Sequence, residues 1–214
     1  MNHTTYIFDF DGTLVDSMPY WSEKMLNILR TTNTPYPADV IKYITTLGDA
    51  GTAKYFRDDL HVPLTIEEMY AMMDDYALPM YRDVIGLKEG VREYLAMLRE
   101  NGCSLHVLTA SPHKMVDPCL KRLGIYDWFG NVWSTDDFGL PKSDPAIYKE
   151  AVRRIGTDIS DAVFFDDNIN AVKTARTAGL YTVGVYDATG EDFAEEMKTA
   201  ANRYFSAFTD APLL

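Results

Sequence analysis

Two aspartates one residue apart, Asp9 and Asp11, are the residues of this sequence best suited to chemistry. They follow the apolar run 6–8 and precede Gly12, so the run is predicted to be a buried strand that ends in a turn. Side chains alternate along a strand, and the two aspartates share a side if the strand continues that far. Neighbouring carboxylates repel each other and lose hydration unless a cation pairs with them. The spacing therefore indicates a functional site.

Further polar side chains follow the later apolar runs. The run 105–108 leads into Thr109 and Ser111, and the run 162–165 leads into Asp166 and Asp167. Lys142 lies in a loop before a predicted helix over 145–155. In parallel sheets, ligands bind beyond the carboxyl ends of the strands, where these side chains are expected to gather. Carboxylates, a lysine and hydroxyls together suit a phosphoryl group and a hard cation such as Mg²⁺.

The elements that position these residues change character along the chain. Residues 16–85 are predicted to be helical, with Asp16 or Ser17 as the first N-cap, a helix over 39–47 and a loop over 48–51. From residue 88 onward, apolar strands alternate with helices, which predicts a doubly wound parallel α/β sheet with right-handed crossovers. We therefore expect an α/β core formed by 1–15 and 86–214, and a helical insert over 16–85. Residues 204–205 are a candidate edge strand.

Composition limits the possible partners. The chain has 214 residues, of which 47% are hydrophobic, and this predicts a sizeable core. The net charge of −12 argues against nucleic acid and anionic membranes as partners, although a local cation still permits a small phosphorylated substrate. Two cysteines without metal-ligand spacing fit a reducing cytosol, so a cytoplasmic location is expected. No signal peptide and no apolar run of transmembrane length is recognised.

Four short motifs together resemble the haloacid dehalogenase superfamily. In that family's order they are Asp9-Phe10-Asp11-Gly12-Thr13, Leu108-Thr109-Ala110-Ser111, Lys142 and Phe165-Asp166-Asp167-Asn168. The resemblance covers nearly the whole chain. The insert resembles the helical cap of the subgroup that contains β-phosphoglucomutases and many sugar-phosphate and phosphoglycolate phosphatases. The resemblance implies a Rossmann-like core and phosphoryl chemistry, without specifying a substrate.

The resemblance also implies roles for the acidic residues. Asp9 is expected to be the nucleophile that forms an aspartyl-phosphate, and Asp11 the general acid and then the general base. Mg²⁺ is expected on Asp9, Asp167 and the backbone carbonyl of Asp11. Asp166 stands where many members have glycine, and Ala171 stands where a further aspartate is common. The metal site therefore depends mainly on Asp167, with Asp166 or water as a supplement.

The remaining motif residues are expected to bind phosphate. The resemblance implies that Thr109, Ala110 and Lys142 hold phosphoryl oxygens and offset charge in the transition state. Gly12 is expected to let the backbone turn sharply after the first strand. Ser143 follows Lys142 where proline is common in the family, and little effect is expected from this difference.

Three functions remain open on these residues. The first is a Mg²⁺-dependent phosphatase for a small phosphorylated metabolite, expected to be a monomer or weak homodimer. The second is a phosphomutase, disfavoured because 16–30 lacks the histidine that such members carry early in the cap. The third is a non-catalytic phosphate-binding protein, ranked last because Asp9 and Asp11 are both present. Dehalogenation is set aside because family dehalogenases lack the second aspartate.

Overall fold

A six-stranded parallel sheet forms the centre of the protein. The structure is a computed structural model that describes residues 3–45 and 47–214, so Met1, Asn2 and Thr46 lie outside the description. The strand order is β3-β2-β1-β4-β5-β6. The strands are β1 (Thr5–Phe8), β2 (Ser104–Thr109), β3 (Asn131–Ser134), β4 (Ala162–Asp166), β5 (Tyr181–Val185) and β6 (Arg203–Phe205). The predicted doubly wound α/β sheet is confirmed, and the candidate edge strand is β6, paired with β5.

Both faces of the sheet are covered by helices, which explains the apolar run Tyr6-Ile7-Phe8 in β1. Tyr6 and Phe8 pack with residues of α5 and α6, whereas Ile7 packs with α7 and α8 on the opposite face. A strand buried on both faces needs a continuous apolar run rather than an alternating one. The helices of this part of the chain are α5 (Val91–Glu100), α6 (His113–Arg122), α7 (Pro145–Ile155), α8 (Ile169–Ala178) and α9 (Ala194–Ala200).

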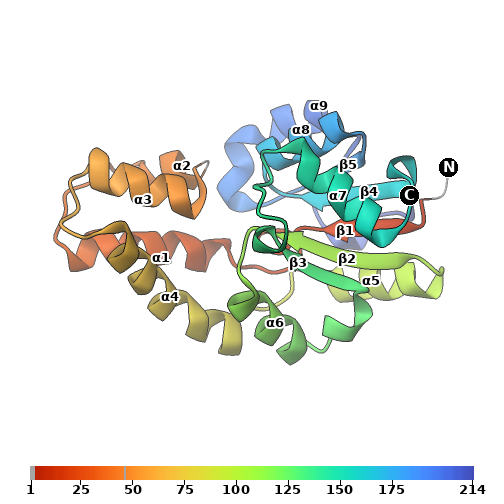
Figure 1. The fold of residues 1–214 in the computed structure, drawn as a ribbon, viewed down its shortest axis with the longest axis horizontal. Coiled ribbons are helices and arrows are strands. Elements are labelled where there is room, and N and C mark those ends of the chain that lie inside the picture. The colour runs from red at the N-terminus through yellow and green to blue at the C-terminus, as the bar shows by residue number, and fades with distance from the viewer. Residues whose placement is uncertain (1–2, 46) are drawn as a thin grey trace.

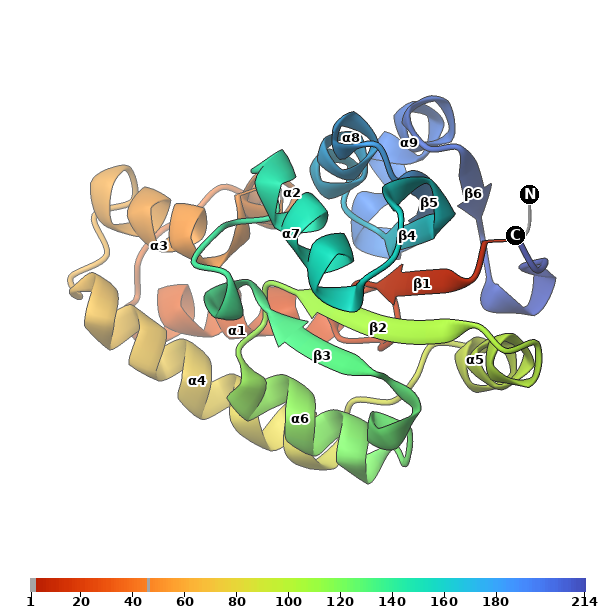
Figure 2. The ribbon, with the colours of Figure 1, turned by 45° about the vertical axis from the view of Figure 1, so that its right-hand side comes forward.

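A helical segment follows β1 and precedes α5 in the sequence; its helices are α1 (Met18–Thr31), α2 (Val40–Thr45), α3 (Gly48–Asp58) and α4 (Ile66–Asp83). Met25, Phe56 and Met69 belong to an apolar cluster that these helices share. The arrowheads of β1 and β3 point toward this helical segment, so it faces the carboxyl ends of the strands (Figures 1 and 2). This is the edge where the sequence predicts the site.

The helical segment leaves and rejoins the sheet region through two adjacent connections. The backbone N–H of Asp16 donates to the carbonyl of Gly86 at 3.0 Å, and that of Lys88 donates to the carbonyl of Leu14 at 3.0 Å. Its last helix, α4, spans two clusters, because Met73 packs among the four helices while Tyr81 packs in the sheet-side cluster. Residues of the insert therefore reach the carboxyl end of β1.

One local prediction in this segment is wrong. The stretch 48–51, expected to be a loop, is the first turn of α3, and the expected helix 39–47 ends as α2 at Thr45, with position 46 outside the described residues. Thr52 and Phe56 of α3 are buried, and this packing outweighs the low helix propensity of the glycines. Asp49 lies in the first turn, where the helix dipole favours a negative charge.

The search for membrane-spanning segments found none: within 3–45 and 47–214, every helix is too short or too polar to cross a bilayer.

Candidate active site

Asp9 lies just beyond β1 and is buried against a lysine. The Lys142 ammonium donates hydrogen bonds to Asp9 Oδ1 and, at 2.8 Å, to Asp166 Oδ2. The Asp9 backbone N–H donates to the carbonyl of Phe165 at 2.8 Å, which ties the ends of β1 and β4 together. The Tyr148 hydroxyl donates to the Lys142 carbonyl at 3.0 Å and fixes the loop that carries the lysine. The strand order therefore brings Asp9 together with Lys142 and Asp166, which follow it by 133 and 157 positions in the sequence.

Three carboxylates face one another at this point. Oxygen atoms of Asp9, Asp166 and Asp167 lie within 4.8 Å of one another, the one such cluster in the part of the chain that the structure describes. Burial raises the pKa of Asp9 to about 8, with Lys142 opposing this shift and Asp166 adding to it. Burial, and next the charge of Asp166, raise the pKa of Asp167 well above its usual range. One ammonium does not neutralise three carboxylates, so the donor set fits a divalent cation with oxygen ligands such as Mg²⁺.

The two neighbouring aspartates of β4 differ in what they contact. Asp166 accepts from Lys142 through Oδ2 and from the Asn168 backbone N–H through Oδ1 at 2.7 Å, so both of its oxygens have partners. Asp167 accepts from the Thr13 hydroxyl at 3.2 Å through Oδ1. Asp167 is thus better placed to give an oxygen to a metal, and Asp166 holds the lysine in place.

Gly12 fits this arrangement for two reasons. Its φ is +71°, a left-handed conformation that side chains other than glycine rarely adopt. A Cβ atom at this position would also lie 2.5 Å from Asp167 Oδ2. The turn after β1 therefore needs glycine for its backbone angle and for the space that Asp167 occupies.

Asp11 does not join the acidic cluster, because hydroxyl groups hold its side chain. Its Oδ1 accepts from Tyr81 at 2.5 Å and from Ser17 at 2.7 Å, and its Oδ2 accepts from Ser111 at 2.5 Å. Ser17 is the N-cap residue of α1, one of the two positions predicted for it, but its side chain makes no capping hydrogen bond. Its buried hydroxyl donates to Asp11 instead.

The hydroxyl of Thr109 lies at the carboxyl end of β2. Thr109 is buried, and its Oγ accepts from the Ser111 backbone N–H at 3.0 Å. Among the described residues its hydroxyl proton has no acceptor, so it can donate to a ligand oxygen. Ala110 lies between these two residues and is exposed.

Lys88 and Tyr81 are two contributors that the sequence patterns did not reveal. The Lys88 ammonium donates to the carbonyls of Gly12 at 2.7 Å and Tyr186 at 2.5 Å, and pairs with Asp187 at 3.1 Å. It therefore holds the Gly12 turn in place through the Gly12 carbonyl. Lys88 and Tyr81 belong to none of the four motifs, and only the folded structure brings them to the site.

A polar group formed by Asp49, Trp21 and Lys24 lies on the helical segment. Asp49 accepts from the Trp21 indole N–H at 2.7 Å and from the Lys24 ammonium at 2.8 Å, while its side chain remains 43% exposed. The negative charge of Asp49 also contributes to raising the pKa of Tyr81, after burial and the nearer Asp11.

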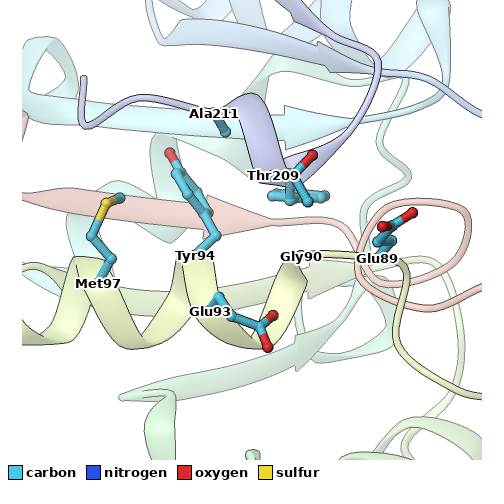
Figure 3. Close-up of a pocket in the computed structure, with 8 residues that line it drawn as sticks. Glu89, Gly90, Glu93, Tyr94, Met97, Thr209 and Ala211 are labelled. Carbon is cyan, nitrogen blue, oxygen red and sulfur yellow. The ribbon is translucent and has the colours of Figure 1, made fainter.

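A separate pocket lies between α5 and the C-terminal segment (Figure 3). Its lining includes Glu89, Glu93, Tyr94 and Thr209, and none of the acidic-cluster residues. Carboxylates at its rim repel phosphate, so the pocket is a poor place for a phosphorylated ligand.

Comparisons with known proteins point to one family. A family model described as a haloacid dehalogenase-like hydrolase matches residues 3–179. The chain is 28% identical to a phosphoglycolate phosphatase of Psychrobacter arcticus, covering 98% of this chain and 96% of that protein. It is 23% identical to hexitol phosphatase B of Escherichia coli K12, covering 84% of this chain and 82% of that protein. The crystal structure of CbbY from Rhodobacter sphaeroides in complex with phosphate has the same fold, with a TM-score of 0.82, 21% identity, and coverage of 97% and 96%.

Proposed function

This chain belongs to the haloacid dehalogenase-like hydrolases, and we propose that it is a Mg²⁺-dependent phosphatase that hydrolyses small phosphate monoesters through an aspartyl-phosphate. The observation that carries the proposal is the buried Asp9, held by Lys142 beside Asp166 and Asp167, with the hydroxyl-bonded carboxylate of Asp11 two residues further on. This set supplies a nucleophile, a cation that offsets phosphoryl charge, and a separate proton carrier.

In the first step, a carboxylate oxygen of Asp9 attacks phosphorus, and the bond from phosphorus to the ester oxygen breaks. Asp11 gives its proton to that leaving oxygen, which departs as an alcohol. The Lys142 ammonium and the free hydroxyl proton of Thr109 donate to the phosphoryl oxygens, on which charge increases in the transition state. The product of this step is the phosphate ester of Asp9, with Asp11 ionised.

In the second step, water attacks the phosphorus atom of the aspartyl-phosphate. Asp11 takes a proton from that water, and the bond from phosphorus to the Asp9 oxygen breaks. Phosphate leaves, Asp9 is again a carboxylate and Asp11 is again protonated. Proton transfers of this kind typically contribute about 10²–10⁴-fold to the rate.

Asp9, Asp167 and the backbone carbonyl of Asp11 would hold Mg²⁺, with Asp166 as a supplement. When bound, the ion neutralises negative charge shared between the carboxylates and the phosphoryl oxygens. The raised pKa values of Asp9 and Asp167 support the need for this cation, because they reflect uncompensated buried charge.

Residues 16–85 form the proposed cap, and residues 1–15 and 86–214 the proposed catalytic core. The four helices have an apolar cluster of their own and face the strand ends (Figure 1). Two ion pairs join the proposed parts, Lys42 with Asp192 at 2.7 Å and Lys114 with Asp74 at 2.5 Å. A cap that closes over the site would exclude bulk water from the aspartyl-phosphate.

The proposed substrate is a small phosphorylated metabolite. Relatives are named phosphoglycolate phosphatase and hexitol phosphatase B, and the net charge of −12 disfavours nucleic acid and anionic membranes. Two free cysteines are consistent with the proposed cytoplasmic location. For the assembly we propose a monomer or weak homodimer.

Phosphate release from a panel of metabolites tests the proposed function. The panel contains phosphoglycolate, hexose and hexitol phosphates, nucleotides and β-glucose 1-phosphate, each with Mg²⁺. Asp9→Asn serves as the blank, and Asp16→Asn, which changes an exposed aspartate, is the matched control. We expect release from at least one monoester by the wild type and by Asp16→Asn, and none by Asp9→Asn. Conversion of β-glucose 1-phosphate to glucose 6-phosphate without release would instead indicate a mutase, and no reaction by folded protein would contradict both activities.

A further inference from the structure

The hydroxyls on Asp11 come from three separate parts of the chain. Ser17 precedes α1, Tyr81 lies on α4, and Ser111 follows β2. Each donates to an Asp11 oxygen at 2.5–2.7 Å, the range of short O–H···O⁻ bonds to an ionised acceptor. Together they fix the rotation of the carboxyl group about its Cβ–Cγ bond.

Tyr81 is held rigidly at this place. It is only 6% exposed and belongs to the same apolar cluster as Phe10, Ala77 and Ile85. Its ring stacks on Phe10, with centroids 6.1 Å apart and planes at 25°. Phe10 lies between Asp9 and Asp11 in the sequence, so the packing that orients the tyrosine is continuous with the strand end that carries the nucleophile.

We propose that Tyr81 is a positioning residue for acid–base catalysis: its hydroxyl, with those of Ser17 and Ser111, orients the carboxyl group of Asp11 toward the leaving oxygen. The inference rests on the proposed function and adds to it. It gives the helical segment a direct part in the chemistry, because the positioning hydroxyl of α4 belongs to that segment.

Hydroxyl groups suit this role in both protonation states of Asp11. A serine or tyrosine hydroxyl donates one hydrogen bond and also accepts, so each can hold a carboxylate and then a carboxylic acid. One Asp11 oxygen accepts from two hydroxyls and the other from one, so the oxygen with the single partner, Oδ2, has more capacity left for the leaving group or water. A proton carrier with a fixed orientation spends less of its time in unproductive geometries.

The test compares two esters that differ in their need for an acid. 4-Nitrophenolate leaves without a proton, whereas phenolate leaves faster when it is protonated. We would measure kcat/KM for 4-nitrophenyl phosphate and phenyl phosphate with Mg²⁺ for wild type, Tyr81→Phe and Ser111→Ala. Tyr81→Phe keeps the ring that packs on Phe10. The matched control is Tyr76→Phe on the same helix, because the Tyr76 hydroxyl has no hydrogen bond among the described residues.

We expect Tyr81→Phe to lower kcat/KM for phenyl phosphate by about tenfold and for 4-nitrophenyl phosphate by less than about threefold, as befits partial loss of acid catalysis. Ser111→Ala should show the same selectivity, and Tyr76→Phe should match the wild type on both esters. In the Asp11→Asn background, adding Tyr81→Phe should have no further effect, since the group that it positions is gone.

Equal losses on the two esters would overturn the inference, because a purely structural role of Tyr81 lowers both. An unchanged rate on phenyl phosphate, or an undiminished effect of Tyr81→Phe in the Asp11→Asn background, would also overturn it. Wild-type protein inactive on both esters would instead refute the proposed function, and this inference with it.

Discussion

Replacement of Lys142 by methionine should change catalysis and metal binding in opposite directions. The Lys142 ammonium donates to both Asp9 and Asp166, and its side chain is only 13% exposed. Methionine keeps much of the length and apolar packing of the stem but removes the charge and both hydrogen bonds. Loss of one such electrostatic donor typically lowers kcat by about 10²–10³-fold.

The same substitution leaves the buried carboxylates of Asp9 and Asp166 without the ammonium that pairs with both. Breaking a buried pair costs about 3–5 kcal/mol, and for a chain of this length 1 kcal/mol corresponds to about 2–4 °C in Tm. Taking the lower value, we expect metal-free Lys142→Met to unfold about 6–12 °C below the wild type. Mg²⁺ should restore much of this loss, because the ion supplies the charge that the lysine provided. The variant should therefore bind Mg²⁺ at least as tightly as the wild type.

The assay combines thermal unfolding over a Mg²⁺ titration with steady-state phosphate release. Lys149→Met, which changes an exposed lysine on α7, is the matched control and should match the wild type in both. Turnover by Lys142→Met within threefold of the wild type would refute the assigned role. Weaker Mg²⁺ binding by this variant would show that the lysine organises the metal ligands rather than competing with the metal.

Three further predictions follow from single features of the structure. Gly12→Ala should weaken Mg²⁺ binding by about tenfold or more in calorimetry, because its Cβ would lie 2.5 Å from Asp167 Oδ2, whereas Gly124→Ala, with a similar φ and open space, should bind normally. Burial lowers the pKa of His106 to about 4. The neutral imidazole therefore contributes about 3 kcal/mol to the free energy of unfolding above pH 6.5, and this contribution is lost as the pH falls through about 4. Urea unfolding at pH 7 and 4.5 should show this loss in the wild type and not in His106→Leu; equal pH dependence would contradict it. EDTA should abolish phosphate release, and added Mg²⁺ should restore it; full activity in EDTA would remove the metal from the account.

The sheet could be predicted from the sequence because its determinants are local. The strands β1 and β4 are built around the apolar runs 6–8 and 162–165, which lie between turns, and parallel connections leave few possible topologies. Asp9, Asp166 and Lys142 converge for the same reason, since each lies at or beside the carboxyl end of a strand or in the loop that follows one. A motif at a strand end therefore predicts where its side chains lie in the fold.

The partners of Asp11 could not be predicted in this way. Tyr81 is 70 residues from Asp11 in the sequence and reaches it only through the path of α4, which no local pattern specifies. Asp16 or Ser17 is the N-cap that the sequence predicts, and Ser17 stands at that position, but its hydroxyl donates to Asp11 rather than to the helix backbone. The stretch 48–51 is helical because Phe56 and its neighbours pack in a shared cluster, a tertiary effect that overrides the two glycines.

Direct observation of phosphorylated Asp9 is the measurement that tests the central claim most closely. The protein would be mixed with substrate and Mg²⁺, quenched in acid within one turnover, and examined by intact and peptide mass spectrometry. We predict the added mass of one phosphoryl group, located on the peptide that contains Asp9 and absent from Asp9→Asn. Turnover of substrate with no phosphorylated intermediate at Asp9, or with the phosphoryl group on another residue, would contradict the account.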